Sequence, residues 1–300
     1  MNYISTKQAS AKWGISQRRV RVLCEQGRVE GAVRMGKSYG IPENAKRPTD
    51  ERFKDLTLNE LYDKIELKLK ELKSKRPLTQ GELKRLNDDF AVEYTYNSNA
   101  IEGNTLTLRE TALVLQGLTI GEKPIKEHLE ATQHRDAFNF VCDMVSKQAP
   151  LSEEVIKQIH AIILNDRPLD RGVYRQASVR IMGAFHIPPN PIKIPTLMQD
   201  LLKDFKTEEA NIIKKAAQFH VRFERIHPFI DGNGRTGRLI ANLELMKAGY
   251  PPIDVKFTDR KDYYESFNDV EKTTWKMERL FAEYVLERIE DYLKIVCQVI

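Results

Sequence analysis

Apolar side chains recur every three or four residues over most of the chain, a spacing that predicts amphipathic helices. In the first long stretch these positions are Leu61, Ile65, Leu69 and Leu72. Thr57 and Glu60 stand just before them with the spacing of a capping box, in which each side chain satisfies the other residue's backbone amide. Further helix starts of this kind are Thr79 with Glu82, Thr107 with Glu110, and Ser152. The chain is therefore predicted to be mainly α-helical.

One segment departs from this spacing. In residues 173–195, Val179 and Ile181 alternate with other side chains, Gly183 supplies a turn, and prolines follow. Alternation with a period of two is typical of a β-strand. We therefore expect a small β-hairpin set into the helical domain.

The first 48 residues follow a shorter pattern, which predicts a helix, a turn at Gly14 and a second helix capped by Ser16. A short hairpin around Gly36 is expected next. Prolines and charges in "IPENAKRPTDER" suit a domain boundary. Three parts are thus predicted: a small domain over residues 1–48, a helical linker over 49–78 and a larger domain over 79–300.

Composition narrows the class of protein. The 300 residues are 41% hydrophobic, enough for one substantial core and a second, smaller one. With 48 basic and 43 acidic residues the net charge is +5, a mild bias that permits contact with nucleic acid or nucleotides. Cys24, Cys142 and Cys297 lie far apart without metal-binding spacing and predict reduced thiols. No apolar leader or long apolar run occurs, so we expect a cytoplasmic protein without membrane contact.

Three stretches fit a phosphate-binding pattern, and their surroundings separate them. Residues 31–38, "GAVRMGKS", match a P-loop, but the "YGIPENAKRP" that follows cannot open the required helix. Residues 232–237, "GNGRTG", match the dinucleotide fingerprint, but the preceding "QFHVRFERI" has helical spacing where that fingerprint requires a strand. The third pattern is the longer "HPFIDGNGRTGR", residues 227–238, followed by a predicted helix that ends at Gly249.

In this third pattern the loop opens a helix, so the amides of residues 232–234 form a cradle for an anion. Arg235 and Arg238 share one helix face and can hold successive phosphates. A carboxylate beside a phosphate requires a bridging cation, which makes Asp231 a candidate Mg²⁺ ligand. His227 then lies beside the same phosphate as a candidate general base. Singly, each residue could serve only the structure of the loop; together they indicate attack by a hydroxyl on a nucleotide phosphate.

The stretch matches the Fic family signature, HPFx(D/E)GNGRxxR. The matching residues are His227, Pro228, Phe229, Asp231, Gly232, Asn233, Gly234, Arg235 and Arg238. The chain resembles a Fic protein over roughly residues 79–295. This resemblance implies an all-helical Fic domain with a β-hairpin flap. It also implies transfer of AMP from ATP to a protein Ser, Thr or Tyr hydroxyl, with release of pyrophosphate.

The resemblance assigns a role to each residue of the motif. His227 corresponds to the base and Asp231 to the Mg²⁺ ligand. The α-phosphate would be held by Asn233 and by the amides of Gly232 and Gly234. Arg235 and Arg238 would hold the β- and γ-phosphates, and Thr236 and Gly237 complete the ATP-binding stretch.

Two further segments resemble parts of the family. In "DRKDYYESF", Tyr263 and Tyr264 would lie near the adenine, with core packing as the alternative for Tyr264. The family often has an asparagine seven residues after the second tyrosine; Glu271 stands there, so the motif does not fix the choice of base. Residues 175–186 resemble the flap, along which a target protein would align by strand addition.

A second motif, "SNAIEG" at residues 98–103, matches the family's inhibitory pattern (S/T)xxxE(G/N). Gly103 is expected just beyond a helix end, which places Glu102 in the last turn. The helix dipole disfavours a carboxylate there by roughly 0.3–1 kcal/mol, so a cationic partner from elsewhere is indicated. The resemblance gives Arg238 as this cationic partner. It implies that Ser98 and Glu102 belong to an inhibitory motif, in which Glu102 binds Arg238 and keeps it from the γ-phosphate. A solvated surface glutamate is the alternative.

The first 48 residues are similar to a winged helix-turn-helix of the excisionase or MerR type. Arg18, Arg19 and Arg21 would lie on or beside the recognition helix, with Arg34 and Lys37 on the wing, suited to DNA phosphates. A protein-docking module of the same fold is the alternative.

The sequence thus predicts an ATP- and Mg²⁺-dependent protein adenylyltransferase that also modifies itself, is inhibited by Glu102 and carries a DNA-binding module. The alternatives within the family are removal of AMP and transfer of another phosphate-containing group. The alternative outside enzymes is a DNA-binding regulator whose Fic domain only senses nucleotide. The resemblance leaves a homodimer open and does not name the target protein.

Overall fold

The computed structural model describes residues 2–13, 17–25, 27–36, 38–45, 56–75, 80–181, 186–267 and 275–297. About 65% of the chain is helical. The strands found in these residues form one small three-stranded sheet near the N-terminus. The mainly helical fold expected from the apolar spacing is therefore confirmed.

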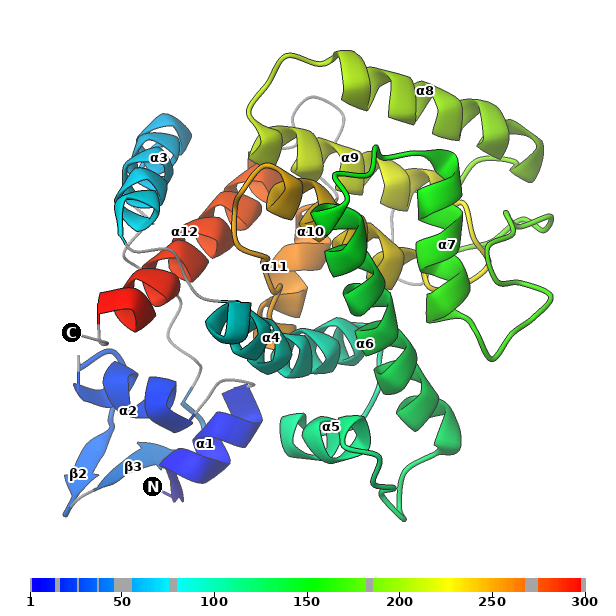
Figure 1. Cartoon of the computed structure of the whole chain (residues 1–300). Coiled ribbons are helices and arrows are strands. Elements are labelled where there is room, and N and C mark those ends of the chain that lie inside the picture. Colours follow the sequence, from blue (N-terminus) through cyan, green and yellow to red (C-terminus); the bar gives the residue numbers. More distant parts are fainter. Residues whose placement is uncertain are drawn as a thin grey trace.

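The N-terminal part, drawn in blue in Figure 1, has its own small core of apolar side chains. Its elements are β1 (Tyr3–Ser5), α1 (Thr6–Trp13), α2 (Gln17–Glu25), β2 (Val33–Met35) and β3 (Ser38–Pro42). The two helices and the hairpin follow the prediction, whereas β1, which pairs antiparallel with β3, was not predicted. The buried side chains of this core include Trp13, Val20, Leu23 and Ile41. The predicted turn and cap at Gly14 and Ser16 lie outside the described residues.

The remaining helices form one larger body. They are α3 (Leu58–Ser74), α4 (Gln80–Ile101), α5 (Leu108–Leu115), α6 (Ile125–Ser146), α7 (Glu153–Ile163), α8 (Ile194–Thr207), α9 (Ile212–Ile226), α10 (Asn233–Lys247), α11 (Arg260–Glu265) and α12 (Trp275–Cys297). Two short 3₁₀ turns are η2 (Pro191–Lys193) and η3 (Phe257–Asp259). The capping boxes predicted at Thr57 and Thr107 are present, and Ser152 caps α7. The start predicted at Thr79 lies outside the described residues.

Helices α9 and α10 lie at the centre of this body, between two clusters of buried apolar side chains. One cluster joins them to α4, α6, α7 and α8, and the other joins them to α3, α11 and α12. In the second cluster α3 lies along α12 (Figure 1) and buries Leu61, Ile65 and Leu69. The segment expected as a linker is therefore packed against the body. Burial of each of these three side chains stabilises the folded chain by about 1.5–3 kcal/mol.

The segment expected as a β-hairpin differs from that prediction. Its described parts, residues 173–181 and 186–195, contain no strand; the tip, 182–185, lies outside the described residues. One side chain, Arg175, donates to four carbonyl groups instead, those of His227 (2.8 Å), Ala177 (2.8 Å), Pro189 (2.7 Å) and Ile226 (3.5 Å). Because a single guanidinium ties both arms to the following loop, a strand ladder is not needed to hold them.

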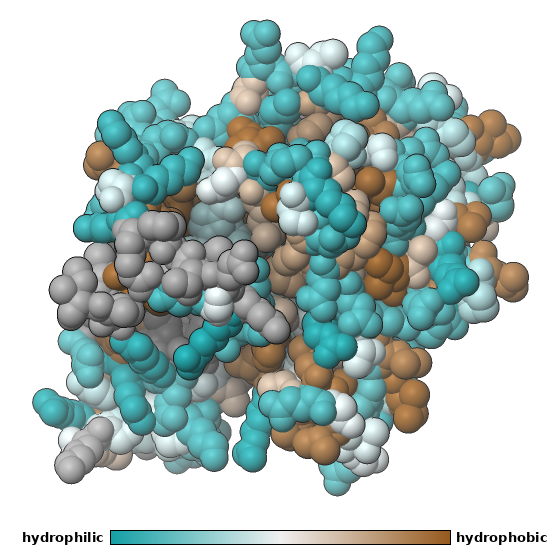
Figure 2. Space-filling view, in the orientation of Figure 1, coloured by the Kyte–Doolittle hydropathy of each residue, from teal (hydrophilic) through white to brown (hydrophobic). Residues whose placement is uncertain are grey.

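Figure 2 shows a mainly hydrophilic face, with hydrophobic side chains gathered around α5 and the neighbouring end of α6. Large apolar side chains exposed in this region include Leu118, Ile125 and Leu129. Among the described helices, none combines the length and apolar character needed to cross a bilayer.

Candidate active site

The loop between α9 and α10 holds most of the predicted site, and two backbone features shape it. His227 ends α9 in the left-handed conformation (φ 49°), and Gly232 precedes α10 at φ 73°. The Asn233 side chain accepts from the Phe229 amide and donates to the Phe229 carbonyl, both at 2.9 Å. The polar groups of Asn233 are thus used to close the loop. The backbone amides at the start of α10 remain as donors for an anion, because helix-terminal amides have no intrahelical partner.

Behind this loop stands His160 of α7, whose ring stacks on Phe229 with centroids 3.6 Å apart. Its Nδ1 accepts from the Gly172 amide at 2.9 Å. The ring therefore carries its hydrogen on Nε2 and donates it to the Asp231 carbonyl at 3.0 Å. Burial lowers the pKa of His160 to about 4, so the ring stays neutral and holds the loop from beneath.

The start of α10 already has an anion beside it. A methyl group added to Gly234 would place its carbon 2.1 Å from Oε1 of Glu102, so this carboxylate lies directly against the first turn. The partial positive charge at a helix N-terminus favours a carboxylate there, as it would a phosphate. A side chain at position 234 would displace the Glu102 carboxylate from this place.

Arg238 fixes this carboxylate from the next turn of α10. Its Nη2 donates to Oε1 of Glu102 at 2.8 Å and to the Ser98 carbonyl at 2.8 Å. Nε donates to Oγ of Ser98 at 3.0 Å, and Nη1 donates to the Tyr263 hydroxyl at 3.0 Å. Burial would lower the pKa of Arg238, but Tyr263 and Glu102 raise it above its usual value. The contact between Glu102 and Arg238 that the sequence predicted is present.

Glu102 directly follows the last residue of α4, and this helix end is itself held in place. Gly103 follows it at φ 104°, as predicted for a helix end. The Ile101 carbonyl accepts from Nε of Arg260 at 2.8 Å and from the Tyr264 hydroxyl at 3.3 Å. The Arg260 guanidinium also lies 5.0 Å from the centroid of the Tyr264 ring. A cation at a helix C-terminus stabilises the helix. Arg260 and Tyr264 of α11 therefore hold this end of α4 in place.

The two tyrosines predicted near the adenine lie in different surroundings. Tyr263 is 1% exposed, and its hydroxyl joins Arg238 to Nε2 of His220 (2.8 Å). Tyr264 is 38% exposed and lies beside the end of α4. Only the second therefore presents a surface that a bound base could reach directly. Glu271, the departure from the family pattern, lies outside the described residues.

His227 is a buried, neutral imidazole. Its side chain is 18% exposed, and burial together with Arg175 and His186 lowers its pKa to about 4. Its Nδ1 lies 3.8 Å from Oε2 of Glu224, one turn back on α9. At pH 7 the ring is therefore free to accept a proton, as a general base must.

Asp231 is exposed enough to reach a ligand and is surrounded by cations. Its side chain is 40% exposed, Oδ1 accepts from the Gly232 amide at 2.6 Å, and Oδ2 accepts from Nη1 of Arg167 at 3.0 Å. Nη2 of Arg235 lies 3.5 Å from Oδ1. Burial alone would raise the pKa of Asp231, but these neighbours lower it, so the carboxylate stays ionised.

Arg235, Thr236 and Gly237 face the interior of the domain. Arg235 is 3% exposed, and its Nη1 lies 3.8 Å from Glu130 of α6. Thr236 is fully buried. A methyl group at Gly237 would lie 2.6 Å from Nδ1 of His220, so Gly237 allows α9 and α10 to approach closely. Thr236 and Gly237 thus contribute to packing beneath the loop.

A model of the Fic/DOC family matches residues 150–245, which include α7, the loop and most of α10. These residues of the chain form a Fic/DOC domain. It is 38% identical over 215 residues to the protein adenylyltransferase Fic of Nematostella vectensis, covering 70% of this chain and 50% of that protein. With its namesake from Drosophila melanogaster the identity is 33%, covering 66% and 42%. The chain thus spans about half the length of the curated relatives it matches.

Two solved Fic structures resemble the whole helical body. A Fic domain containing signaling protein from Bacteroides thetaiotaomicron matches with a TM-score of 0.70 at 27% identity, over 80% of this chain and 97% of that one. A fragment of Fic-1 from C. elegans matches with a TM-score of 0.72 at 28% identity, over 80% and 73%. The Fic architecture expected from the motif is confirmed.

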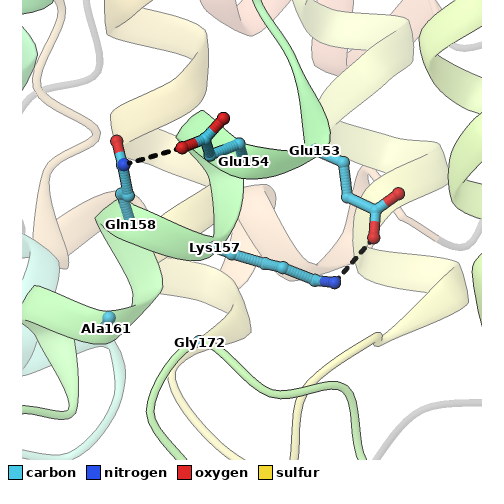
Figure 3. Close-up of a pocket in the computed structure, with 6 residues that line it drawn as sticks. All are labelled: Glu153, Glu154, Lys157, Gln158, Ala161 and Gly172. Atoms are coloured by element: carbon cyan, nitrogen blue, oxygen red, sulfur yellow. Dashed lines mark hydrogen bonds and ion pairs between the residues drawn. The ribbon is translucent and has the colours of Figure 1, made fainter.

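A cavity of about 530 Å³ lies on the outer side of α7, next to Gly172, and holds none of the motif residues. Figure 3 shows its two side-chain pairs, Lys157 with Glu153 (2.7 Å) and Gln158 with Glu154 (3.4 Å). Because these charges pair with one another, the cavity offers no converging groups for catalysis. It adjoins the Fic site through Gly172, whose amide donates to Nδ1 of His160.

Sequence reasoning missed five residues that shape this Fic site. They are His160, Arg167, Arg175, Glu224 and Arg260. Three of them stand in segments whose spacing predicts ordinary helix or loop, whereas Arg175 lies in the segment expected as the flap and Arg260 in the segment that resembles the family after the motif. Arg260 begins "RKDYYESF" and carried a signal only as a cation near two tyrosines.

Proposed function

We propose that this Fic protein transfers AMP from ATP to a hydroxyl side chain of a protein, including itself, and that Glu102 inhibits the transfer. The observation that carries the proposal is the Glu102 carboxylate, held by Arg238 against the first turn of α10. A carboxylate bound at the first turn of α10 indicates that this turn binds anions. The same carboxylate occupies the position that a phosphate of ATP would need. The relatives named protein adenylyltransferase support the choice of reaction.

In the proposed reaction ATP places its α-phosphate against the amides at the start of α10. His227 removes the proton of the target hydroxyl, whose oxygen then forms a bond to the α-phosphorus. The bond from that phosphorus to the bridging oxygen breaks, and pyrophosphate leaves. Backbone amides aimed at the α-phosphate oxygens would stabilise the charge that develops there. The target side chain ends as a phosphodiester of AMP, and His227 carries one proton until solvent takes it.

Mg²⁺ fits this site through Asp231. Among the described residues no group of three or more His, Cys, Asp or Glu side chains could hold a metal unaided. Asp231 offers one ionised, accessible carboxylate, which suits an ion that takes one or two carboxylates and completes its shell with phosphate oxygens and water. When bound, Mg²⁺ would neutralise phosphate charge. Arg167, which now donates to Asp231, would have to give way.

Inhibition follows from competition for Arg238. The γ-phosphate and Glu102 would both require this guanidinium, which uses four of its five N–H donors in the present arrangement, one of them for Glu102. While Glu102 holds it, ATP can bind only in a position displaced from the base. Removal of AMP from a modified protein would use the same groups and is the alternative direction.

Labelled ATP separates the reactions. ATP carrying the label on its α-phosphate should label the protein, whereas ATP labelled on the γ-phosphate should not. Label from the γ-phosphate alone would indicate a kinase, and label from neither, with nucleotide still bound, would indicate a sensor. The Glu102→Gly variant should be assayed beside the wild-type chain, so that inhibition is not mistaken for lack of activity.

Residues 1–48 are proposed as a DNA-binding module. They contain ten basic and three acidic residues, a local excess of seven positive charges in a chain whose total is +5. Arg18 and Arg21 on α2 and Arg34 on β2 are exposed. The side chain of Arg19 and the whole of Lys37 lie outside the described residues. Basic side chains on the second helix and on the hairpin suit phosphate contacts in the manner of a winged helix-turn-helix.

A further inference from the structure

Three polar side chains follow one another on α9: His220, Glu224 and His227. Each has a buried atom without a hydrogen-bond partner among the described residues, namely Nδ1 of His220, Oε1 of Glu224 and Nδ1 of His227. Buried polar atoms are nearly always paired, so this row requires an explanation. The mechanism above uses His227 and leaves Glu224 without a role.

Glu224 faces both halves of the site. Its Oε1 lies 3.2 Å from the position of a methyl group on Gly237, so the carboxyl group rests against α10. Its Oε2 lies 3.8 Å from Nδ1 of His227. A shift of about 1 Å would bring these two atoms to hydrogen-bond distance and would pair Nδ1 of the histidine.

The backbone of His227 is consistent with a constrained ring. A left-handed conformation is rare outside glycine and marks places where the chain is held for a purpose. Here it ends α9 and leaves the imidazole within reach of the residue three positions earlier. Nδ1 lies 3.8 Å from the Glu224 carboxyl group, and the Glu224 backbone carbonyl also acts on the ring and raises its pKa. Both acceptors belong to Glu224 and lie on the Nδ1 side of the ring, which leaves Nε2 for the substrate.

We propose that Glu224 is a positioning residue for His227. Its carboxyl oxygen accepts the hydrogen of Nδ1, which keeps Nε2 unprotonated and directed at the target hydroxyl. A carboxyl group that orients an imidazole in this way sets both its tautomer and its basicity. This inference rests on the proposed function and deepens it, because it adds a residue to the same reaction.

The surroundings of Glu224 also connect it to Glu102. Burial raises the pKa of Glu224 to about 8; Glu102 raises it and Arg238 lowers it. The other titratable groups that face Glu224 or His227 are Tyr263 from α11, His220 on α9, and Arg175 and His186 from the segment before α8. In the Glu102→Gly chain the γ-phosphate takes this place beside Arg238, so the pKa of Glu224 stays raised and its carboxyl group ionises as the pH approaches 8. The carboxylate formed there stabilises the imidazolium and strengthens the base.

The test uses full-length chains that carry Glu102→Gly, with Glu224→Gln or Glu224→Leu added and Glu209→Gln, an exposed glutamate, as control. The glutamine keeps an oxygen acceptor, so kcat at pH 7 should stay within about threefold. The leucine should lower kcat about 10- to 100-fold while KM for ATP changes less than twofold. In the Glu102→Gly chain kcat should rise between pH 6 and 8 as Glu224 ionises. Adding Glu224→Gln removes the ionising group, so this rise should be absent.

A second measurement does not depend on turnover. Nitrogen-15 NMR of the imidazole rings, with His227→Ala to assign the signal, should show His227 protonated on Nδ1 in the wild type and a mixture of tautomers in Glu224→Leu. An unchanged tautomer, or a leucine variant whose kcat and pH profile match its parent, would overturn the inference. So would a parallel loss of kcat, ATP affinity and melting temperature, which would indicate a structural role. If Glu102→Gly transfers no AMP at all, the proposed function fails, while the tautomer still tests the contact.

Discussion

His227 stays neutral at pH 7 because burial lowers its pKa to about 4, and the anion site is formed by the start of α10 and by Arg238. His227→Ala should therefore bind ATP with nearly unchanged affinity and lose transfer by about 10²- to 10⁴-fold, the usual value of a general base. Calorimetric titration with ATP and α-labelled transfer measure the two quantities separately. Full transfer in the variant would remove His227 from the mechanism, and loss of ATP affinity would point to a role in holding the loop.

Single residues differ in how far their role could be predicted. A carboxylate in the last turn of a helix conflicts with the dipole, which predicted a cationic partner for Glu102, and the family resemblance supplied Arg238 as that partner. Asn233 was predicted on the α-phosphate, yet both its polar groups bind the backbone of Phe229. His160 could not be found, because its importance lies in a stacking contact 69 residues away along the chain, at Phe229.

At the scale of elements, inhibition depends on where α4 ends. Arg260 and Tyr264 hold that end through the Ile101 carbonyl, one residue before Glu102. Arg260→Ala should loosen the latch and raise transfer severalfold, less than Glu102→Gly does. In a chain that already carries Glu102→Gly the same change should have no further effect. Lys261→Ala, an exposed neighbour on α11, is the control. Equal gains with and without Glu102 would show that Arg260 acts by another route.

The elements themselves were largely predictable. Capping boxes at Thr57 and Thr107 mark helix starts through local hydrogen bonds, which depend on neighbouring residues alone. The β-hairpin in residues 173–195 was not borne out in its described parts, because Arg175 satisfies carbonyl groups there and in the next loop. Alternating side chains cannot reveal such a long-range contact. The packing of α3 along α12 was hidden for the same reason.

For the whole molecule, the buried histidines predict sensitivity to acid. Five of them have a lowered pKa in the folded chain: His134, His160, His186, His220 and His227. Each binds a proton more readily when unfolded, so stability is lost as the pH falls below about 6.5. Glu224 and Asp254 have raised values and act in the opposite sense, which leaves a net uptake of protons on unfolding.

The free energy of unfolding should therefore fall by at least about 1.4 kcal/mol per pH unit between pH 6.5 and 5, the effect of one net proton. Urea titrations followed by tryptophan fluorescence at pH 6.5, 5.75 and 5.0 measure it. His220→Gln should make the dependence shallower by about one proton. A flat or rising stability over this window would show that the histidines are not held neutral.

The N-terminal module predicts a salt-dependent interaction. If Arg18, Arg21 and Arg34 each contact a phosphate, affinity for DNA should fall by roughly 0.9 log units per contact for each tenfold rise in salt. Replacing the three by glutamine in the full chain should abolish most of that slope and leave AMP transfer unchanged. Binding that ignores salt, or no binding at low salt, would favour a protein-docking module.

In the proposed regulation Glu102 inhibits transfer by holding Arg238 at the anion site, and the rate of self-modification depends on this contact. Self-modification from α-labelled ATP should be compared between the wild type and Glu102→Gly at saturating ATP and Mg²⁺. Freeing a charge-assisted pair of a few kcal/mol should raise the rate tens- to hundreds-fold, about one decade per 1.4 kcal/mol. Arg238→Ala should give no such gain, because it removes the γ-phosphate partner together with the clamp. A Glu102→Gly chain that transfers AMP no faster than the wild type would show that Glu102 does not inhibit the transfer.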